Sequence, residues 1–207
     1  MNKFKFKTDG FEIIPKACDP KVADFVYQYL ILREQVTDIL FKTGYIAPSE
    51  NLLGRWDDIQ VPGAFSLYAD VAMEILLLNI KPKVEKISGL KLHENYSYSR
   101  LYKKGNVLKK HKDRFSCEIS TTLNLGGDKW PIYIETNKGK EIEVNLKPGD
   151  MLLYTGNNLS HWRNPLQGIR CGQVFLHYNN VKTKGALKNK YDGRPHLGLP
   201  DHYIKGE

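Results

Sequence analysis

Apolar residues recur at helical spacing in two segments of the first ninety residues. The first begins at Asp19-Pro20, which has the form of an N-cap followed by proline at the first helical position, and it ends at Gly44. The second runs from Ala64 to Ile87, and Pro82 would bend or break it near its end. The two apolar stripes predict helices that support a sheet, joined by a loop rich in turn-forming residues at 48–63.

Short runs that suit β-strands replace the helical pattern later in the chain. Glycine, proline and asparagine separate these runs, whose apolar residues alternate or form brief continuous stretches. The opening residues, 1–7, alternate charged and aromatic side chains and also predict a strand. The later strands are predicted at 96–102, 118–125, 131–135, 141–146, 151–154 and 171–178. The expected fold class is therefore mainly β with N-terminal α (α+β), with the strands in an antiparallel sandwich or jelly roll.

Length and composition fit one folded domain, 1–207, of which 41% of the residues are hydrophobic. We divide it into an N-terminal strand with supporting helices (1–95), a jelly-roll core (96–180) and a basic C-terminal extension (181–207), which is either an ordered strap or a mobile tail. Three widely spaced cysteines suggest neither a zinc site nor a disulfide framework. Without a signal peptide or an apolar run of membrane-spanning length, we expect a cytoplasmic protein with no membrane partner.

Three side chains have the character of metal ligands. His111 and Asp113 are two residues apart, and His161 follows much later in the chain. Two imidazoles and one carboxylate form a facial triad, which holds Fe(II) and leaves coordination positions open. Those positions can accept a bidentate cosubstrate together with dioxygen. The sequence therefore predicts an enzyme that activates oxygen.

Arg170 is a candidate partner for an anionic ligand. It lies nine residues beyond His161 and opens an apolar run, in which strand alternation would place it on the same face as Val174 and Leu176. A guanidinium buried on an apolar face needs an anion, and a dicarboxylic ligand would supply one. The alternative is an arginine at the edge of the sheet, paired with a carboxylate of the protein.

A polar face precedes the candidate ligands. Alternation along 96–102 places Tyr96, Tyr98, Arg100 and Tyr102 on one side of a strand. Three phenols and a guanidinium suit the wall of a polar cavity, although a solvent-facing strand rich in tyrosine is the alternative. The loop segment Trp56-Asp57-Asp58 could reach the mouth of such a cavity or lie on the surface.

These motifs together resemble the prolyl-4-hydroxylase-like branch of the 2-oxoglutarate and Fe(II)-dependent dioxygenases. The resemblance covers roughly residues 96–180 and implies a double-stranded β-helix, a cupin-like jelly roll that would bring His111 and His161 together. It also implies Fe(II), 2-oxoglutarate and O2, with ascorbate as a candidate reductant. The matching segments are Tyr102-x-x-Gly105, His111-x-Asp113, Thr122-Leu123-Asn124, Gly126-Gly127, Lys147-Pro148-Gly149-Asp150, His161 and Arg170.

The same resemblance implies a role for each matching side chain. His111, Asp113 and His161 would bind iron, Arg170 would bind the far carboxylate of 2-oxoglutarate, and Tyr102 would line the cavity. Related protein hydroxylases often have a tyrosine where this chain has Thr122, whose hydroxyl reaches less far. Arg163 is therefore a candidate substitute or partner for Arg170. Residues expected around the ligands or at the substrate are Tyr98, Arg100, Arg114 and Trp162.

The implied activity is hydroxylation of a C–H bond, coupled to decarboxylation of 2-oxoglutarate to succinate and CO2. A peptidyl residue such as proline is the leading substrate; a free amino acid, a small metabolite or a methylated nucleobase is the alternative. An alternative of another class is a non-catalytic metal-binding jelly roll. Arg114 and Glu118 would either orient Asp113 or pair with each other. The sequence leaves both a monomer and a homodimer open.

The net charge of +8 also leaves a nucleic-acid partner open. The basic residues are dispersed, apart from small clusters such as the one formed by Lys109, Lys110 and Lys112 beside the candidate iron site. A basic rim there could attract an acidic peptide or a phosphate backbone. Because a solvated basic surface explains the charge equally well, we do not favour nucleic acid as the partner.

Overall fold

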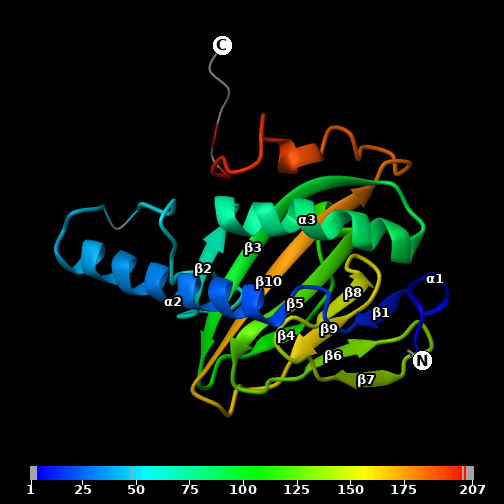
Figure 1. Cartoon of the computed structure of the whole chain (residues 1–207), viewed down its shortest axis with the longest axis horizontal. Helices are drawn as coiled ribbons and strands as arrows, with labels where there is room; N and C mark the ends of the chain where they lie inside the picture. The colour runs from blue at the N-terminus through cyan, green and yellow to red at the C-terminus, as the bar shows by residue number, and fades with distance from the viewer. Residues whose placement is uncertain (1–3, 48, 202, 204–207) are drawn as a thin grey trace.

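The computed structural model describes residues 4–47, 49–201 and 203. Its strands form two antiparallel sheets, and Figure 1 shows the helices lying across one face of the larger sheet. The larger sheet has the order β1 (Phe11–Ile14), β8 (Met151–Thr155), β5 (Ile119–Gly127), β10 (Arg170–Asn180), β3 (Leu92–Lys103) and β2 (Phe65–Tyr68). The smaller sheet has the order β4 (Leu108–His111), β9 (His161–Arg163), β6 (Ile132–Glu135) and β7 (Glu141–Val144). The jelly roll predicted from the sequence is confirmed.

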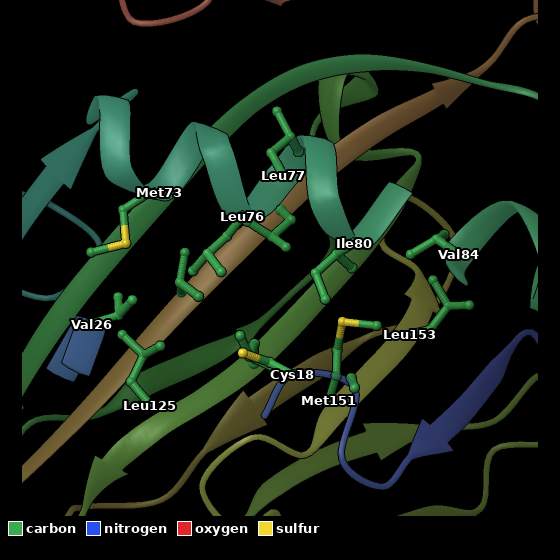
Figure 2. Packing of buried hydrophobic residues seen from close by; sticks show 14 of the residues in the cluster. Cys18, Val26, Met73, Leu76, Leu77, Ile80, Val84, Leu125, Met151 and Leu153 are labelled. Carbon is green, nitrogen blue, oxygen red and sulfur yellow. The ribbon is translucent and has the colours of Figure 1, made fainter. Parts of the chain in front are cut away.

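Two long helices cover the larger sheet. In α2 (Pro20–Lys42), the Asp19 carboxylate accepts a hydrogen bond from Lys21 N at 2.8 Å, which confirms the predicted N-cap. The inner face of α3 (Val71–Ser88) packs against β3 and β10, and Figure 2 shows this layer from close by. The apolar residues of α3 that point toward the sheet include Met73, Leu77, Ile80 and Val84. This layer is the main hydrophobic core, and it supports the larger sheet.

The second helical prediction, Ala64–Ile87, is wrong at its start. Phe65–Tyr68 is strand β2, and α3 begins only after Asp70, whose carboxylate accepts a hydrogen bond from Ala72 N at 3.0 Å. The sequence pattern also predicts one packing stripe of Leu67, Val71, Ile75 and Leu78, and this is wrong because Val71 and Ile75 are more than half exposed. Pro82 lies inside α3 without ending it.

The predicted strand at 1–7 is wrong where the structure describes it; residues 1–3 lie outside the described residues. Phe6–Asp9 is a short helix, α1, and the strand β1 follows at Phe11–Ile14. The Asp9 carboxylate accepts a hydrogen bond from Lys5 N at 2.8 Å, which stabilises this turn over an extended backbone.

The described part of the C-terminal extension packs on the core, and we call it the C-terminal strap. It contacts β3 through the 3₁₀ helix Lys190–Gly193. A 3₁₀ helix at Phe115–Cys117 follows Asp113. Figure 1 shows the strap, in orange and red, running along the end of the sheets near α3. Among the described residues, no helix has both the length and the apolar character needed to cross a membrane.

Candidate metal centre

The structure brings His111, Asp113 and His161 together. Strands β4 and β9 are antiparallel neighbours, and His111 pairs with His161 in register. Asp113 Oδ1 lies 3.5 Å from His111 Nε2 and 3.4 Å from His161 Nε2. One potential ligand atom from each residue lies within 4.8 Å of the others. The three ligands predicted from the sequence therefore form a compact cluster.

Backbone carbonyls orient both imidazoles. His111 Nδ1 lies 2.8 Å from Lys109 O, and His161 Nδ1 lies 3.0 Å from Leu159 O. Because a carbonyl can only accept, each Nδ1 carries the proton and each Nε2 presents its lone pair to the cluster. Two nitrogen donors and one carboxylate oxygen on a single face fit an octahedral divalent cation with open positions.

Asp113 is held from its other side. Its backbone N–H donates to Gly156 O at 2.9 Å, and its Oδ2 accepts a hydrogen bond from Ser120 Oγ at 3.0 Å. Burial pushes the pKa of Asp113 upward, but the neighbouring imidazoles of His111 and His161 outweigh it, so the pKa lies well below its usual range. The ligand carboxylate is thus ionised and ready for a cation.

Behind Asp113, His177 is buried and neutral. Its Nδ1 lies 3.0 Å from Ser120 Oγ, and its ring packs on Tyr96 with centroids 4.6 Å apart. Burial lowers the pKa of His177 to about 4. The Ser120 hydroxyl therefore joins a neutral imidazole to the ligand carboxylate without adding a second positive charge behind the site.

A cavity of about 1040 Å³ opens onto the three ligands. Tyr96, Tyr98 and Arg100 of β3 form one wall, so the polar cavity predicted from their alternation is confirmed. Phe175 of β10 lies beside them. The fourth residue of this face, Tyr102, is fully buried beyond the cavity lining, with its ring against Trp130 at a centroid distance of 4.6 Å.

Two carboxylates from distant parts of the chain, Asp58 and Asp192, line the cavity at its mouth. Asp58 Oδ2 accepts hydrogen bonds from the Tyr98 hydroxyl and, at 2.6 Å, from Arg100 Nη2. Burial pushes the pKa of Asp58 upward, but the charge of Arg100 and these hydrogen bonds outweigh it and the pKa is lowered. Trp56-Asp57-Asp58 therefore reaches the mouth through Asp58.

The second carboxylate, Asp192 in the C-terminal strap, was not foreseen. Its Oδ2 accepts hydrogen bonds from the Tyr68 hydroxyl and from Arg114 Nη2, both at 2.7 Å. The expected alternative pairing of Arg114 with Glu118 is wrong, because the Glu118 carboxylate accepts from Thr183 at 2.7 Å and from other groups at the start of the strap. Asp192 lies in a segment without hydrophobic periodicity, so the local sequence did not indicate its position at the cavity.

Arg163 lies two residues beyond His161 and is 1% exposed. Its Nη2 lies 3.4 Å from Thr122 Oγ1 and 3.2 Å from Gln173 Oε1, and its Nη1 donates to the Trp130 carbonyl. Burial lowers the pKa of Arg163. Within the described residues no carboxylate forms an ion pair with this guanidinium, so a buried cation has only neutral partners.

Arg170 is placed elsewhere. It shares a face of β10 with Val174 and Leu176, as predicted, but that face packs against the helices and not on the cavity. Arg170 Nη2 pairs with Glu34 of α2 at 3.3 Å, and 39% of its side chain is exposed. As in the second of the two alternatives, Arg170 pairs with a carboxylate of the protein, but it lies at the end of the central strand β10 and not at the edge of the sheet.

Trp162 also lies outside the cavity lining. Because its neighbours His161 and Arg163 point inward, alternation turns the indole to the outer side of β9. There it stacks on Tyr133 at a centroid distance of 5.6 Å, with Lys110 Nζ 4.5 Å from its ring centre. Its contacts are those of a surface aromatic cluster.

Known proteins are similar to this chain in structure but do not match it in sequence. No family model matches the chain, and no curated protein sequence matches it. A prolyl-4-hydroxylase from Pseudomonas putida is similar in structure, with a TM-score of 0.63, 14% identity, and coverage of 84% of this chain and 95% of that one. HygX from Streptomyces hygroscopicus, with nickel and 2-oxoglutarate bound, has a TM-score of 0.61, 14% identity, and coverage of 86% and 85%.

A prolyl hydroxylase from Trichoplax adhaerens, in complex with a peptide fragment of the hypoxia-inducible factor oxygen degradation domain, is similar over 84% of this chain and 85% of that one. The TM-score is 0.59 and the identity 12%. At these identities the likeness establishes the fold. The chain has the double-stranded β-helix of the 2-oxoglutarate and Fe(II)-dependent oxygenases, with helices packed on its larger sheet.

Proposed function

We propose that this protein is an Fe(II)- and 2-oxoglutarate-dependent dioxygenase that hydroxylates a C–H bond. The observation that carries the proposal is the cluster of His111, Asp113 and His161, with both Nε2 atoms and one carboxylate oxygen directed at one point on the floor of a cavity. Bound there, iron with 2-oxoglutarate and O2 would supply the oxidising chemistry and release succinate and CO2. The chain itself supplies ligation, orientation and a shielded cavity.

For the far carboxylate of 2-oxoglutarate we propose Arg163 in place of Arg170. Arg163 is buried on the inward face of β9, two residues beyond the metal ligand His161 and behind the residues that line the cavity. An anion that reached it would supply the charged partner that its guanidinium lacks among the described residues. Thr122 Oγ1 lies 3.4 Å from it and could donate a further hydrogen bond. The Tyr102 hydroxyl is buried without a well-formed hydrogen bond, and its interaction with Arg163 opposes the lowering of the Arg163 pKa by burial. Tyr102 is therefore the third candidate.

Around the ligands, Tyr98, Arg100 and Arg114 would face the substrate from the cavity wall. We propose a peptidyl residue such as proline as the substrate. Support comes from the likeness to a bacterial prolyl-4-hydroxylase and to a prolyl hydroxylase with a bound peptide fragment. A cytoplasmic setting is part of this proposal, because reducing conditions would keep iron ferrous and would preserve the free thiols of the three buried cysteines.

Anaerobic titration of the Fe(II)-bound protein with 2-oxoglutarate tests the proposal. The wild type should develop the weak visible metal-to-ligand charge-transfer band of a chelated keto acid, and His161→Ala should not. No band in the wild type, with metal nevertheless bound, would withdraw the oxygenase proposal and favour a non-catalytic metal-binding jelly roll.

A further inference from the structure

A second cavity, of about 450 Å³, adjoins the metal cavity. Ile59, Gln60 and His111 border both cavities. The other walls of the second cavity come from Val61 and Pro62 on one side and from the turn at 105–107 on the other. A ligand in the metal cavity could therefore extend past His111 into a second space that holds no metal ligand of its own.

The segment 56–63, which we call the clamped loop, is held firmly at the boundary between the cavities. The Asp58 carboxylate fastens it to Tyr98 and Arg100. Within the loop, Gln60 N donates to Asp58 Oδ1 at 2.8 Å, and Gly63 N donates to Trp56 O at 2.8 Å. The backbone at Gln60 is thus positioned before any ligand arrives.

The Gln60 side chain points at the metal-binding nitrogen of His111. Gln60 Nε2 lies 2.9 Å from His111 Nε2. Because His111 Nδ1 carries its proton toward Lys109 O, Nε2 is the acceptor in this contact. A cation bound to Nε2 would take the same lone pair. The Gln60 amide would then be free, with both a donor and an acceptor directed at the junction of the two cavities.

The two cavities differ in chemistry. Several charged groups surround the metal cavity, whereas the second cavity is bordered by the aliphatic side chains of Ile59, Pro62 and Val107. Of its described lining residues, Lys109 carries a full charge, and it lies next to His111. Ile59 is 96% exposed although its loop is rigidly held, and Val107 faces it from the opposite wall at 37% exposure. Exposed aliphatic side chains on a fixed backbone suit contact with an apolar group of a ligand.

We propose that the second cavity is a subsite for an apolar side chain of an extended peptide whose modified residue lies in the metal cavity. Gln60 is the positioning residue at the boundary, and its freed amide pairs with the peptide backbone. The inference rests on the proposed function. Small-molecule pockets occupy about 300–1,000 Å³, so the metal cavity alone would hold a metabolite, while the continuous second space suits a longer chain.

A synthetic peptide library tests the subsite. The peptides carry proline at the centre and one varied position at a time, and mass spectrometry records the gain of one oxygen in the presence of Fe(II) and 2-oxoglutarate. We expect the wild type to prefer leucine, isoleucine or valine over aspartate at least tenfold at one position beside the proline. Ile59→Asp and Val107→Asp should abolish that preference.

Ile169→Asp is the matched control. Like Ile59, Ile169 is a largely exposed isoleucine, at 80% exposure, but it borders neither cavity. It should keep the preference. A flat preference in the wild type, or loss of it in Ile169→Asp as well, would overturn the subsite. If the charge-transfer band forms but no peptide is modified, the subsite is wrong while the dioxygenase stands. Absence of the band would instead indicate failure of the proposed function.

Gln60→Ala gives a readout that does not depend on turnover. Titration with Co(II) should show binding a few-fold tighter than in the wild type, because the metal no longer displaces an amide from His111. The KM for the preferred peptide should rise at least fivefold with little change in kcat. Gln167→Ala, at an exposed glutamine whose side chain caps its own turn, should change neither quantity. Unchanged Co(II) affinity and KM in Gln60→Ala would overturn the role of Gln60.

Discussion

Arg194 Nη2 donates a hydrogen bond to the Glu74 carboxylate at 2.8 Å, and the two side chains are 2% and 3% exposed. This buried ion pair fastens the C-terminal strap to α3, a few residues from Asp192 at the cavity mouth. Burial raises the pKa of Glu74, with Arg194 acting against it. Arg194→Met should therefore leave a carboxylate buried without its cation and lower the free energy of unfolding by about 3–5 kcal/mol. Urea denaturation at pH 7 measures the change.

The double variant Glu74→Leu with Arg194→Met is the control for this pair. Removing both charges together leaves no buried ion unpaired, so most of the lost stability should return. A single variant that stays within about 1 kcal/mol of the wild type would contradict the prediction, because that is the range of an exposed ion pair.

We expect substitutions of Arg163 and Arg170 to differ in their effect on 2-oxoglutarate binding. Arg163→Met removes a charge-assisted partner of a carboxylate and should weaken 2-oxoglutarate binding to the Ni(II) form at least about 100-fold. It should still fold, because it leaves no carboxylate unpaired. Arg170→Ala should change that affinity less than about twofold and cost at most about 1 kcal/mol, since it removes only a half-exposed pair with Glu34. Calorimetry measures both affinities, and the reverse pattern would restore Arg170 as the anchor.

His177 makes stability depend on pH. Burial lowers its pKa to about 4 in the folded protein, against about 6.5 in the unfolded chain. Between these values the unfolded chain binds the extra proton, so its contribution to stability is present above pH 6.5 and is lost as the pH falls toward 4. The loss amounts to about 3 kcal/mol. In His177→Asn this part of the pH dependence should be missing from urea titrations; an unchanged slope would show that His177 is not buried as a neutral group.

Gly156 leaves room for the ligand carboxylate. A Cβ atom built there would lie 2.3 Å from Asp113 Oδ2 and 2.4 Å from Cys117 O. Gly156→Ala should therefore displace Asp113 and weaken Co(II) binding at least tenfold. Gly172→Ala is the control: its Cβ would meet the Tyr27 ring at 2.5 Å, so it should cost stability but keep the metal affinity. Equal Co(II) affinities in the two variants would remove Gly156 from the account of the site.

Much of this fold follows from local pattern. The Asp19 cap and the glycine after the first helical segment delimit α2 within two residues, and breaks at glycine and asparagine locate the strands of the core. The spacing of His111 and Asp113 puts both side chains on one side of an extended segment, so two of the ligands could be assigned together. Their meeting with His161 depends on the pairing of β4 and β9, which only the fold resemblance suggested.

The predictions that failed concern which face of a strand lies against the helices and which face lines the cavity. The sequence correctly groups Arg170 with Val174 and Leu176, but their apolar character marks contact with helices and not the wall of a cavity. The cavity lies on the opposite face, where Phe175 and His177 project. The boundary between β2 and α3 was also missed. The chain turns there at Ala69, which has a left-handed backbone conformation that alanine rarely adopts, so the residue type does not indicate a turn.

The carboxylates Asp58 and Asp192 each hold one segment at the cavity through a tyrosine of the larger sheet and an arginine, which is Arg100 of β3 for Asp58 and Arg114, in the segment after β4, for Asp192. Neither segment contributes a metal ligand. Part of the surface that would recognise a substrate therefore lies in segments that are separate in the chain from the metal ligands. Exchange of 56–63 and 190–193 for the corresponding segments of another protein with this fold, with both aspartates kept, is the smallest graft by which substrate range could be transferred onto an unchanged metal centre.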